Sequence, residues 1–276
     1  MSPLSWQTPP LEQPLPEGPI AEPGQPPDSQ PPTASLRRVP WVLGHRGARH
    51  AAPENTLAAF ELARVEGAVG SELDVQLTRD GRLFVVHDFA LTRVTGGRDR
   101  RVVAQMSSPE LERVRVQGDQ PVPRLEAVID WARTHGLLLN IELKSAHARR
   151  DRIAEATVEL LRRYPDAERW ACISSFHPVL VQRCSHALPQ VQAALIVGPN
   201  HPCLLRPRWL DAVGARAVHP QAKLVLRRPN LRERIGSERQ INCWTVNDVQ
   251  TARKLAQMGV HALISDCPGR LLQGLE

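Results

Sequence analysis

The sequence WVLGHRGARHAAPENTLAAFELARVE (residues 41–66) begins with a short apolar run at 41–44 and ends with a longer amphipathic run at 56–66. The first run has the length and composition of a buried strand, and the second has the apolar spacing of a helix. A strand followed by a helix is the repeating unit of proteins with parallel sheets. The stretch therefore predicts a βα unit whose polar residues, beginning with His45, lie where the strand ends.

The same alternation continues to the C-terminus. Further strands are predicted at residues 71–77, 137–143, 171–175, 191–197, 217–219, 241–246 and 262–265. Further helices are predicted at residues 125–134, 152–164, 179–187, 208–213, 225–235 and 249–258, with a short one at the C-terminus. Eight units in 276 residues indicate an α/β fold with one closed (β/α)8 barrel of the TIM type, which takes about 250 residues.

Two segments fall outside this alternation. Asp80-Gly81 is a hairpin signal, and the apolar run that follows at 83–87 predicts a small β-ribbon inserted after the second strand. Almost half of the 25 prolines lie in the first 40 residues, mixed with Gln, Glu, Ser and Gly. Such a composition cannot form a packed core. We therefore expect residues 1–38 to be a disordered tail, passive or a docking site for a partner, and residues 39–276 to form the barrel.

Composition narrows the class of protein. The chain is 42% hydrophobic and 23% charged, which is ordinary for a globular protein. Its net charge is +6, but the basic residues, nearly all Arg, are scattered along the chain. A small phosphodiester substrate is therefore expected as partner, and a nucleic-acid site is not.

The cysteines and the lengths of the apolar runs indicate where in the cell the protein is expected. The five cysteines form no CxxC spacing and are odd in number, which favours reduced thiols in the cytoplasm. The N-terminus lacks the pattern of a secretory signal, and no run of 18 apolar residues occurs. Export by the general route and stable membrane insertion are not expected.

Three carboxylates follow the predicted strands. Glu72 and Asp74 are two residues apart on one strand, so both point to the same face, and Glu142 ends the next barrel strand. Anionic oxygens at one barrel mouth repel one another unless a hard divalent cation joins them, and oxygen ligands favour Mg²⁺ or Ca²⁺. The alternative is a buried ion network in which the acids pair with Arg46 and Lys144.

Two histidines close strands at the same mouth. His45 and His87 are placed to act as base and acid, since imidazole transfers protons near neutral pH. Asp88 or Glu54 could orient them. The planar guanidinium of Arg46 and the compact ammonium of Lys144 suit phosphate oxygens. Together with the acids, these residues predict metal-assisted hydrolysis of a phosphate ester.

From residue 42 to the end, the chain resembles the glycerophosphodiester phosphodiesterase family. The matching motifs, in order, are Gly44-His45-Arg46-Gly47, Pro53-Glu54-Asn55-Thr56, Glu72-Leu73-Asp74-Val75, Thr78-Arg79-Asp80-Gly81, Val85-Val86-His87-Asp88, Pro123-Arg124-Leu125-Glu126, Ile141-Glu142-Leu143-Lys144, Ser174-Ser175-Phe176, Trp244-Thr245-Val246-Asn247 and Ser265-Asp266-Cys267-Pro268. Each motif alone is weak, whereas the ordered set indicates kinship. One departure is Thr92-Arg93-Val94-Thr95, which stands where the family commonly has Asp-Arg-Thr-Thr.

The resemblance implies a TIM-type barrel and one divalent cation held by Glu72, Asp74 and Glu142. It also implies acid–base catalysis by His45 and His87. In the family a glycerol hydroxyl is thought to attack phosphorus, which expels the alcohol and leaves a cyclic phosphate. Water then opens that ring to glycerol 3-phosphate.

The resemblance also implies that Trp244 lines the substrate pocket and that Arg46 and Lys144 contact phosphate. The alternative for Trp244 is an aromatic that fills the barrel. Two other functions stay open. One is a phospholipase D-like phosphodiesterase acting on lysophospholipids, although such proteins are usually exported. The other is a non-catalytic barrel that binds phosphodiesters, which could dispense with His45 or His87.

Overall fold

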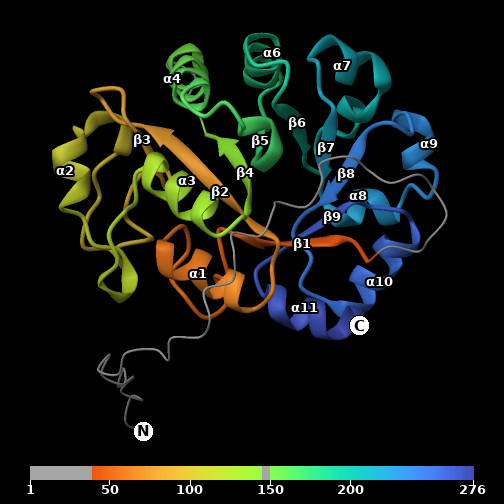
Figure 1. Ribbon diagram of the computed structural model, residues 1–276, viewed down its shortest axis with the longest axis horizontal. Helices are drawn as coiled ribbons and strands as arrows, with labels where there is room; N and C mark the ends of the chain where they lie inside the picture. The colour runs from red at the N-terminus through yellow and green to blue at the C-terminus, as the bar shows by residue number, and fades with distance from the viewer. Residues whose placement is uncertain (1–38, 145–149) are drawn as a thin grey trace, which may run out of the picture.

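The predicted strands pair as a closed parallel barrel in the computed structural model, which describes residues 39–144 and 150–276 (Figure 1). Strand β1 pairs with both β2 and β9, which closes the sheet on itself. The barrel strands are β1 (Trp41–His45), β2 (Gly70–Leu77), β4 (Leu138–Leu143), β5 (Ala171–Ser175), β6 (Gln192–Val197), β7 (Ala217–Pro220), β8 (Gln240–Cys243) and β9 (Ala262–Ser265). The predicted (β/α)8 fold is confirmed.

Helices surround this barrel, with α4, α6 and α7 along one edge and α1 and α11 along the opposite edge in Figure 1. Leu73 and Val75 of β2 face outward and are fully buried in one apolar cluster with Val128 and Ile129 of α3. Each such side chain stabilises the fold by roughly 1.5–3 kcal/mol. The helix bounds are α1 (Leu57–Val65), α3 (Leu125–Thr134), α4 (Arg150–Arg162), α5 (Ala167–Trp170), α6 (Pro178–Ala187), α7 (Pro207–Ala212), α8 (Ala222–Leu226), α9 (Leu231–Ile235), α10 (Val249–Gln257) and α11 (Pro268–Leu275).

The prediction of a single helix at residues 225–235 is wrong. Two short helices, α8 and α9, stand there instead, and Pro229 lies between them. Proline has no N–H to donate and disfavours helical backbone in the residue before it, so one helix cannot run through this point. The strand predicted at 241–246 is also too long, because the ladder between β8 and β9 stops at Cys243.

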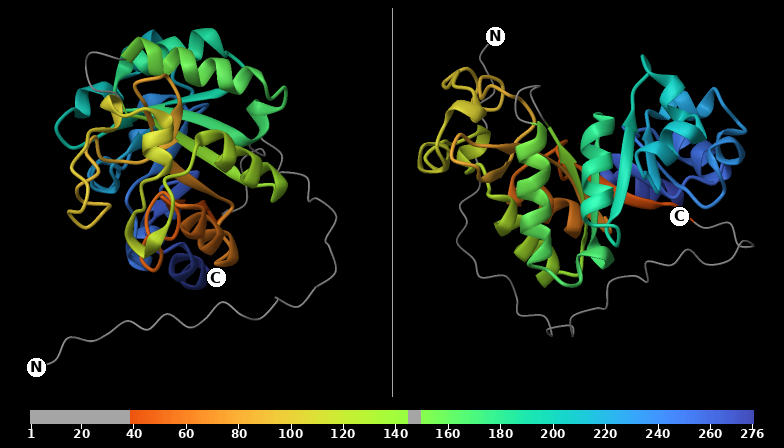
Figure 2. Two further views of the ribbon diagram at one scale, coloured as in Figure 1. Left: turned by 90° about the vertical axis from the view of Figure 1, so that its left-hand side faces the viewer. Right: turned by 90° about the horizontal axis from the view of Figure 1, so that it is seen from above.

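The predicted β-ribbon is present. Strand β3 (Leu83–Val85) pairs antiparallel with β2 beyond the barrel. The chain then makes an insertion that includes the short helix α2 (Ser108–Glu112) and has an apolar cluster of its own around Phe84, Leu91 and Leu111. Figure 2 shows this insertion projecting at one end of the molecule. Its position beside β2 places it next to the carboxyl ends of the barrel strands.

Three further predictions concern the Pro-rich segment, the cysteines and membrane insertion. The Pro-rich segment, residues 1–38, lies outside the described residues. All five cysteines are free thiols, as predicted. In the part of the chain that the structure describes, no helix is long and apolar enough to cross a membrane. The cytoplasmic location stays a prediction.

Candidate active site at the carboxyl ends of the strands

Strand register brings the three predicted carboxylates together. Glu72 of β2 lies opposite His45 of β1, and Asp74 lies opposite Glu142 of β4. One carboxylate oxygen from each of the three acids lies within 4.8 Å of the others, and all three residues are buried. Because these positions lie near the carboxyl ends of parallel strands, the cluster lies at the end of the barrel where this fold places active sites.

The tight turn after β1 positions Arg46. Arg46 and Gly47 both have positive φ, and a Cβ on Gly47 would approach the backbone of Ala59 to 2.5 Å. Only glycine fits there. The turn directs the Arg46 side chain toward the carboxylates, so that its Nε is 3.0 Å from Asp74 Oδ2 and its Nη1 is 2.9 Å from Glu54 Oε1.

Lys144 lies on the other side of the cluster. Its Nζ is 2.8 Å from Glu142 Oε1 and 3.4 Å from Asp74 Oδ1. Burial opposes the charge of Asp74, but Lys144 and Arg46 outweigh it and lower the pKa of this carboxyl. Asn55 Nδ2 also donates to Asp74 Oδ2 at 2.9 Å. Both cations expected at phosphate therefore pair with carboxylates in this structure.

Glu72 is the least compensated acid. It is 3% exposed, and none of the described residues donates a hydrogen bond to its Oε1. Burial, then the charges of Asp74 and Glu142, raise its pKa well above the ordinary value. Burial and Asp74 likewise raise the pKa of Glu142 to about 7. These two carboxylates lack enough positive charge around them.

The ion-pair network around the cluster has an excess of negative charge. It links six carboxylates, those of Glu54, Glu72, Asp74, Asp88, Glu142 and Asp266, with the four cations Arg46, Arg49, Arg93 and Lys144. With all six carboxylates ionised and the histidines neutral, two negative charges stay without a cation. One divalent ion would balance them, and Glu72, Asp74 and Glu142 offer the oxygen ligands that Mg²⁺ or Ca²⁺ takes. The donor set fits such an ion.

Both histidines are held by a carboxylate through the same ring atom. His45 Nδ1 lies 2.6 Å from Asp266 Oδ1, and His87 Nδ1 lies 2.6 Å from Asp88 Oδ1. Since a carboxylate accepts the Nδ1 proton, Nε2 is the atom left to exchange a proton. His45 Nε2 is 3.9 Å from Glu72 Oε2, so it faces the acidic cluster. Burial is the main cause that lowers the pKa of His87.

Asp266 is the residue that the sequence analysis did not single out. It follows β9, and its carboxylate binds both His45 and Asn247, whose Nδ2 is 2.8 Å from Asp266 Oδ2. Hydrogen bonds from His45 and Asn247 lower the pKa of Asp266 in spite of its burial. The available signal was the motif Ser265-Asp266-Cys267-Pro268, which places an acid directly after the last strand.

Arg93 joins the two acids expected to orient the histidines. It donates to both carboxylate oxygens of Glu54 at 2.8 Å and to Asp88 Oδ2 at 2.6 Å. Against their burial, the hydrogen bonds of Arg93 hold the pKa of each acid at about 2. Asp88 thus lies against His87 as expected, whereas Glu54 lies against Arg46 and Arg93 and has no hydrogen bond to either histidine among those of the described residues.

Comparison with known proteins decides the family. The model of the glycerophosphoryl diester phosphodiesterase family matches residues 45–270. This chain belongs to that family. Over 84% of its length it is 30% identical to the glycerophosphodiester phosphodiesterase of Bacillus altitudinis, covering 96% of that protein. The same values hold for the glycerophosphodiester phosphodiesterase of Caldanaerobacter subterraneus.

A solved structure agrees with this membership. The structure of this chain is similar to that of an Oleispira antarctica phosphodiesterase in complex with the product sn-glycerol-3-phosphate. The TM-score is 0.74 at 25% identity, and the match covers 86% of this chain and 97% of that one. As a glycerophosphodiester phosphodiesterase, the chain is a phosphoric diester hydrolase.

Trp244 was predicted either to line the substrate pocket or to fill the barrel. Its Nε1 donates to the carbonyl of His219 at 2.7 Å, and its side chain packs against the apolar cluster of Leu43, Ala262 and Ile264. Its other side meets the Phe176 ring edge-on, with the centroids 5.4 Å apart. Phe176 is 43% exposed and lies 5.9 Å from Lys144 Nζ. Trp244 therefore both fills the barrel and supports an exposed aromatic beside the carboxylate cluster.

Proposed function

We propose that this protein hydrolyses glycerophosphodiesters to glycerol 3-phosphate and an alcohol, with one divalent cation, Mg²⁺ or Ca²⁺, and with His45 and His87 as acid and base. The observation that carries the metal requirement is the charge of the site. With its six carboxylates ionised and the histidines neutral, the ion-pair network has two negative charges in excess, and Glu72 Oε1 is buried without a hydrogen-bond donor among the described residues. Glu72, Asp74 and Glu142 would hold the cation.

When bound, such a cation supplies positive charge next to the phosphoryl oxygens and so stabilises the charge that develops there. The residues of the chain supply the proton transfers. One histidine Nε2 removes the proton of a substrate glycerol hydroxyl, whose oxygen then forms a bond to phosphorus. The other histidine gives a proton to the alcohol oxygen as its bond to phosphorus breaks, and a cyclic phosphate results.

Hydrolysis of the cyclic phosphate reverses these roles. The histidine that gave its proton now accepts one from water, whose oxygen forms a bond to phosphorus. The other histidine returns its proton to the glycerol oxygen as the bond from that oxygen to phosphorus breaks and the ring opens. Both imidazoles are then in their starting state, and glycerol 3-phosphate is released. Asp266 and Asp88 fix the Nδ1 tautomer during both steps, which keeps each Nε2 directed at the reacting atoms.

Three features support glycerophosphodiesters as the substrate. The Oleispira antarctica relative was solved with sn-glycerol-3-phosphate, its product. In this chain Arg46 and Lys144 lie beside the acidic cluster, where they would contact phosphate oxygens once a cation neutralises the acids. The exposed Phe176 offers an apolar surface next to Lys144.

The test is release of glycerol 3-phosphate from glycerophosphocholine by metal-stripped protein, measured with a coupled enzyme assay. We expect no release in EDTA and full release when Mg²⁺ or Ca²⁺ is restored. Full turnover in stripped protein would overturn the metal requirement. Tight binding of the diester with no turnover under any cation would instead support the non-catalytic barrel, and turnover confined to lysophospholipids would support the phospholipase D-like alternative.

A further inference from the structure

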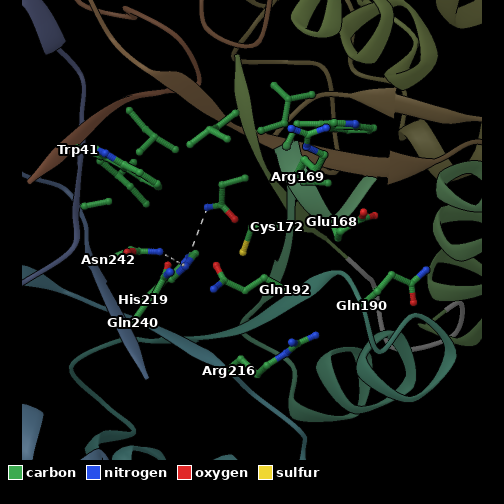
Figure 3. Close-up of a pocket in the computed structure, with 18 residues that line it drawn as sticks. Trp41, Glu168, Arg169, Cys172, Gln190, Gln192, Arg216, His219, Gln240 and Asn242 are labelled. Carbon is green, nitrogen blue, oxygen red and sulfur yellow. Dashed lines mark hydrogen bonds between the residues drawn. The ribbon is translucent and has the colours of Figure 1, made fainter. Parts of the chain in front are cut away.

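A cavity of about 240 Å³ opens at the amino-terminal ends of the barrel strands (Figure 3). Its rim includes Arg169, Gln190 and Arg216, which belong to the segments that precede β5, β6 and β7. The proposed active site lies at the opposite ends of the strands. The cavity is therefore separate from it, and the function proposed above makes no use of it.

Part of the wall of this cavity is polar, although the interior of such a barrel is usually apolar. The interior of a (β/α)8 barrel is normally filled by layers of branched side chains. Here strand positions that line the cavity carry Asn140, Cys172, Gln192, Gln240 and Asn242. Register makes the first three neighbours, since Asn140 pairs with Cys172 and Cys172 with Gln192. Figure 3 shows Cys172, Gln192 and Asn242 directed toward the centre of the cavity.

His219 lies between two of these carboxamides. Its Nδ1 is 3.4 Å from Asn140 Nδ2, and its Nε2 is 3.0 Å from Asn242 Nδ2. Burial lowers the pKa of His219 to about 3, so the ring is neutral, with one donor and one acceptor. It can therefore satisfy only one polar atom of each amide.

Within residues 39–144 and 150–276, Asn140 Oδ1 and Asn242 Oδ1 are buried without a hydrogen-bond partner. Turning either amide by 180° only exchanges which of its atoms lacks one. Asn140 is 3% exposed and lines the cavity, so its second polar atom can be satisfied only by something that occupies the space. Buried polar groups left unpaired cost free energy, and this cost indicates an occupant.

The lining residues define the chemistry of that occupant. Among the described residues around the cavity, the charged side chains Glu168, Arg169 and Arg216 are exposed and precede the strands, whereas the strand positions are neutral. An ion would therefore lose its hydration without a counter-charge in the interior. Carboxamides both donate and accept, as hydroxyl groups do, and Trp41 offers a flat apolar wall. The volume has room for about eight water molecules of roughly 30 Å³ each.

We propose that this cavity binds a small uncharged polyhydroxyl compound, of the size of a cyclitol or a hexose, through the carboxamides of Asn140, Asn242, Gln192 and Gln240. Such a molecule supplies several hydroxyls in one ring, which match several amides at once. It also has a flat apolar face for Trp41. The proposal does not depend on the reaction at the other end of the barrel.

The test uses the full chain with myo-inositol and with glucose, each titrated by calorimetry and by the fluorescence of Trp41 and Trp170, both of which line the cavity. We expect saturable binding of at least one of the two. Gln192→Phe, which fills the cavity from β6, should weaken this binding at least tenfold. Gln240→Leu, a change of polarity with little change of volume, should also weaken it. Gln250→Phe on the exposed side of α10 is the matched control and should bind as the parent does.

The results of this test either support the proposed ligand site or overturn it. Binding that survives in His45→Ala and is lost in Gln192→Phe supports the cavity, because the first variant alters only the other end of the barrel. Binding that is unchanged in both Gln192→Phe and Gln240→Leu overturns the assignment. No binding of either compound overturns it in favour of a water-filled cavity.

Discussion

Replacement of Glu142 by Gln should have opposite effects on stability and on activity. The change keeps the shape of the side chain and removes one of the three clustered negative charges. In metal-free protein it relieves repulsion from Asp74, and with a cation present it removes a ligand. We therefore expect the variant to be more stable than the parent in EDTA at pH 8, and to have lost turnover.

The magnitude follows from the raised pKa of Glu142. Its pKa is about 7 in the folded protein against an ordinary 4.5, owing first to burial and then to Asp74. Between these values the unfolded chain loses the proton and the folded chain keeps it, so stability falls as pH rises. The penalty is absent below about pH 4.5 and complete above about pH 7. At about 1.4 kcal/mol per pH unit it reaches about 3 kcal/mol, which the Gln variant avoids.

The assay is urea unfolding of the parent and of Glu142→Gln at pH 5 and pH 8, in EDTA and in excess Mg²⁺ or Ca²⁺. In EDTA the stability of the variant should exceed that of the parent by up to about 3 kcal/mol at pH 8 and by much less at pH 5. The cation should stabilise the parent strongly and the variant weakly. Glu155→Gln, on the exposed face of α4, is the matched control and should follow the parent.

One result would refute this reasoning. If Glu142→Gln is less stable than the parent in EDTA at pH 8, then Lys144 and Arg46 compensate the three acids without a metal. The cluster would then be the buried ion network that the sequence left open as the alternative. Breaking a compensated buried ion pair typically costs about 3–5 kcal/mol, so the two readings differ in sign as well as in size.

Three other predictions address the remaining parts of the molecule. His45→Ala and His87→Ala should each lower kcat by about 10²- to 10⁴-fold while the cation still raises the unfolding midpoint; loss of that rise would make the histidine a metal ligand. Of the two, only the variant that lacks the acid should recover with a nitrophenyl leaving group. Asp266→Asn should lower kcat less than His45→Ala and add little to it in the double variant, since it acts through His45; an equal loss in both backgrounds would contradict this. Deletion of residues 1–38 should leave the unfolding temperature and turnover nearly unchanged, and a large fall in either would show that this segment contributes to the fold.

The sequence by itself determined the architecture and the composition of the acidic cluster. Apolar spacing is a local property, so it placed α3, β5 and β9 with the bounds that the structure has. Parallel strands end at one mouth, so the polar residues at strand ends could be grouped from the sequence alone. The sequence also contains the cause of the helix break, Pro229, but the periodic apolar residues on either side of it made the segment look like one helix.

Only the tertiary structure decided which groups meet across the barrel. Asp266 lies 221 residues from His45 in sequence, and their hydrogen bond exists because β1 and β9 close the sheet. In the sequence, the polar residues of β4, β7 and β8 look like ordinary interruptions of apolar strands. Closure turns Asn140, His219 and Asn242 toward one interior, where Asn140 Oδ1 and Asn242 Oδ1 have no hydrogen-bond partner among the described residues and both side chains line a cavity. Spacing along a chain fixes which face of a strand a residue occupies, but the register between distant strands fixes what that face meets.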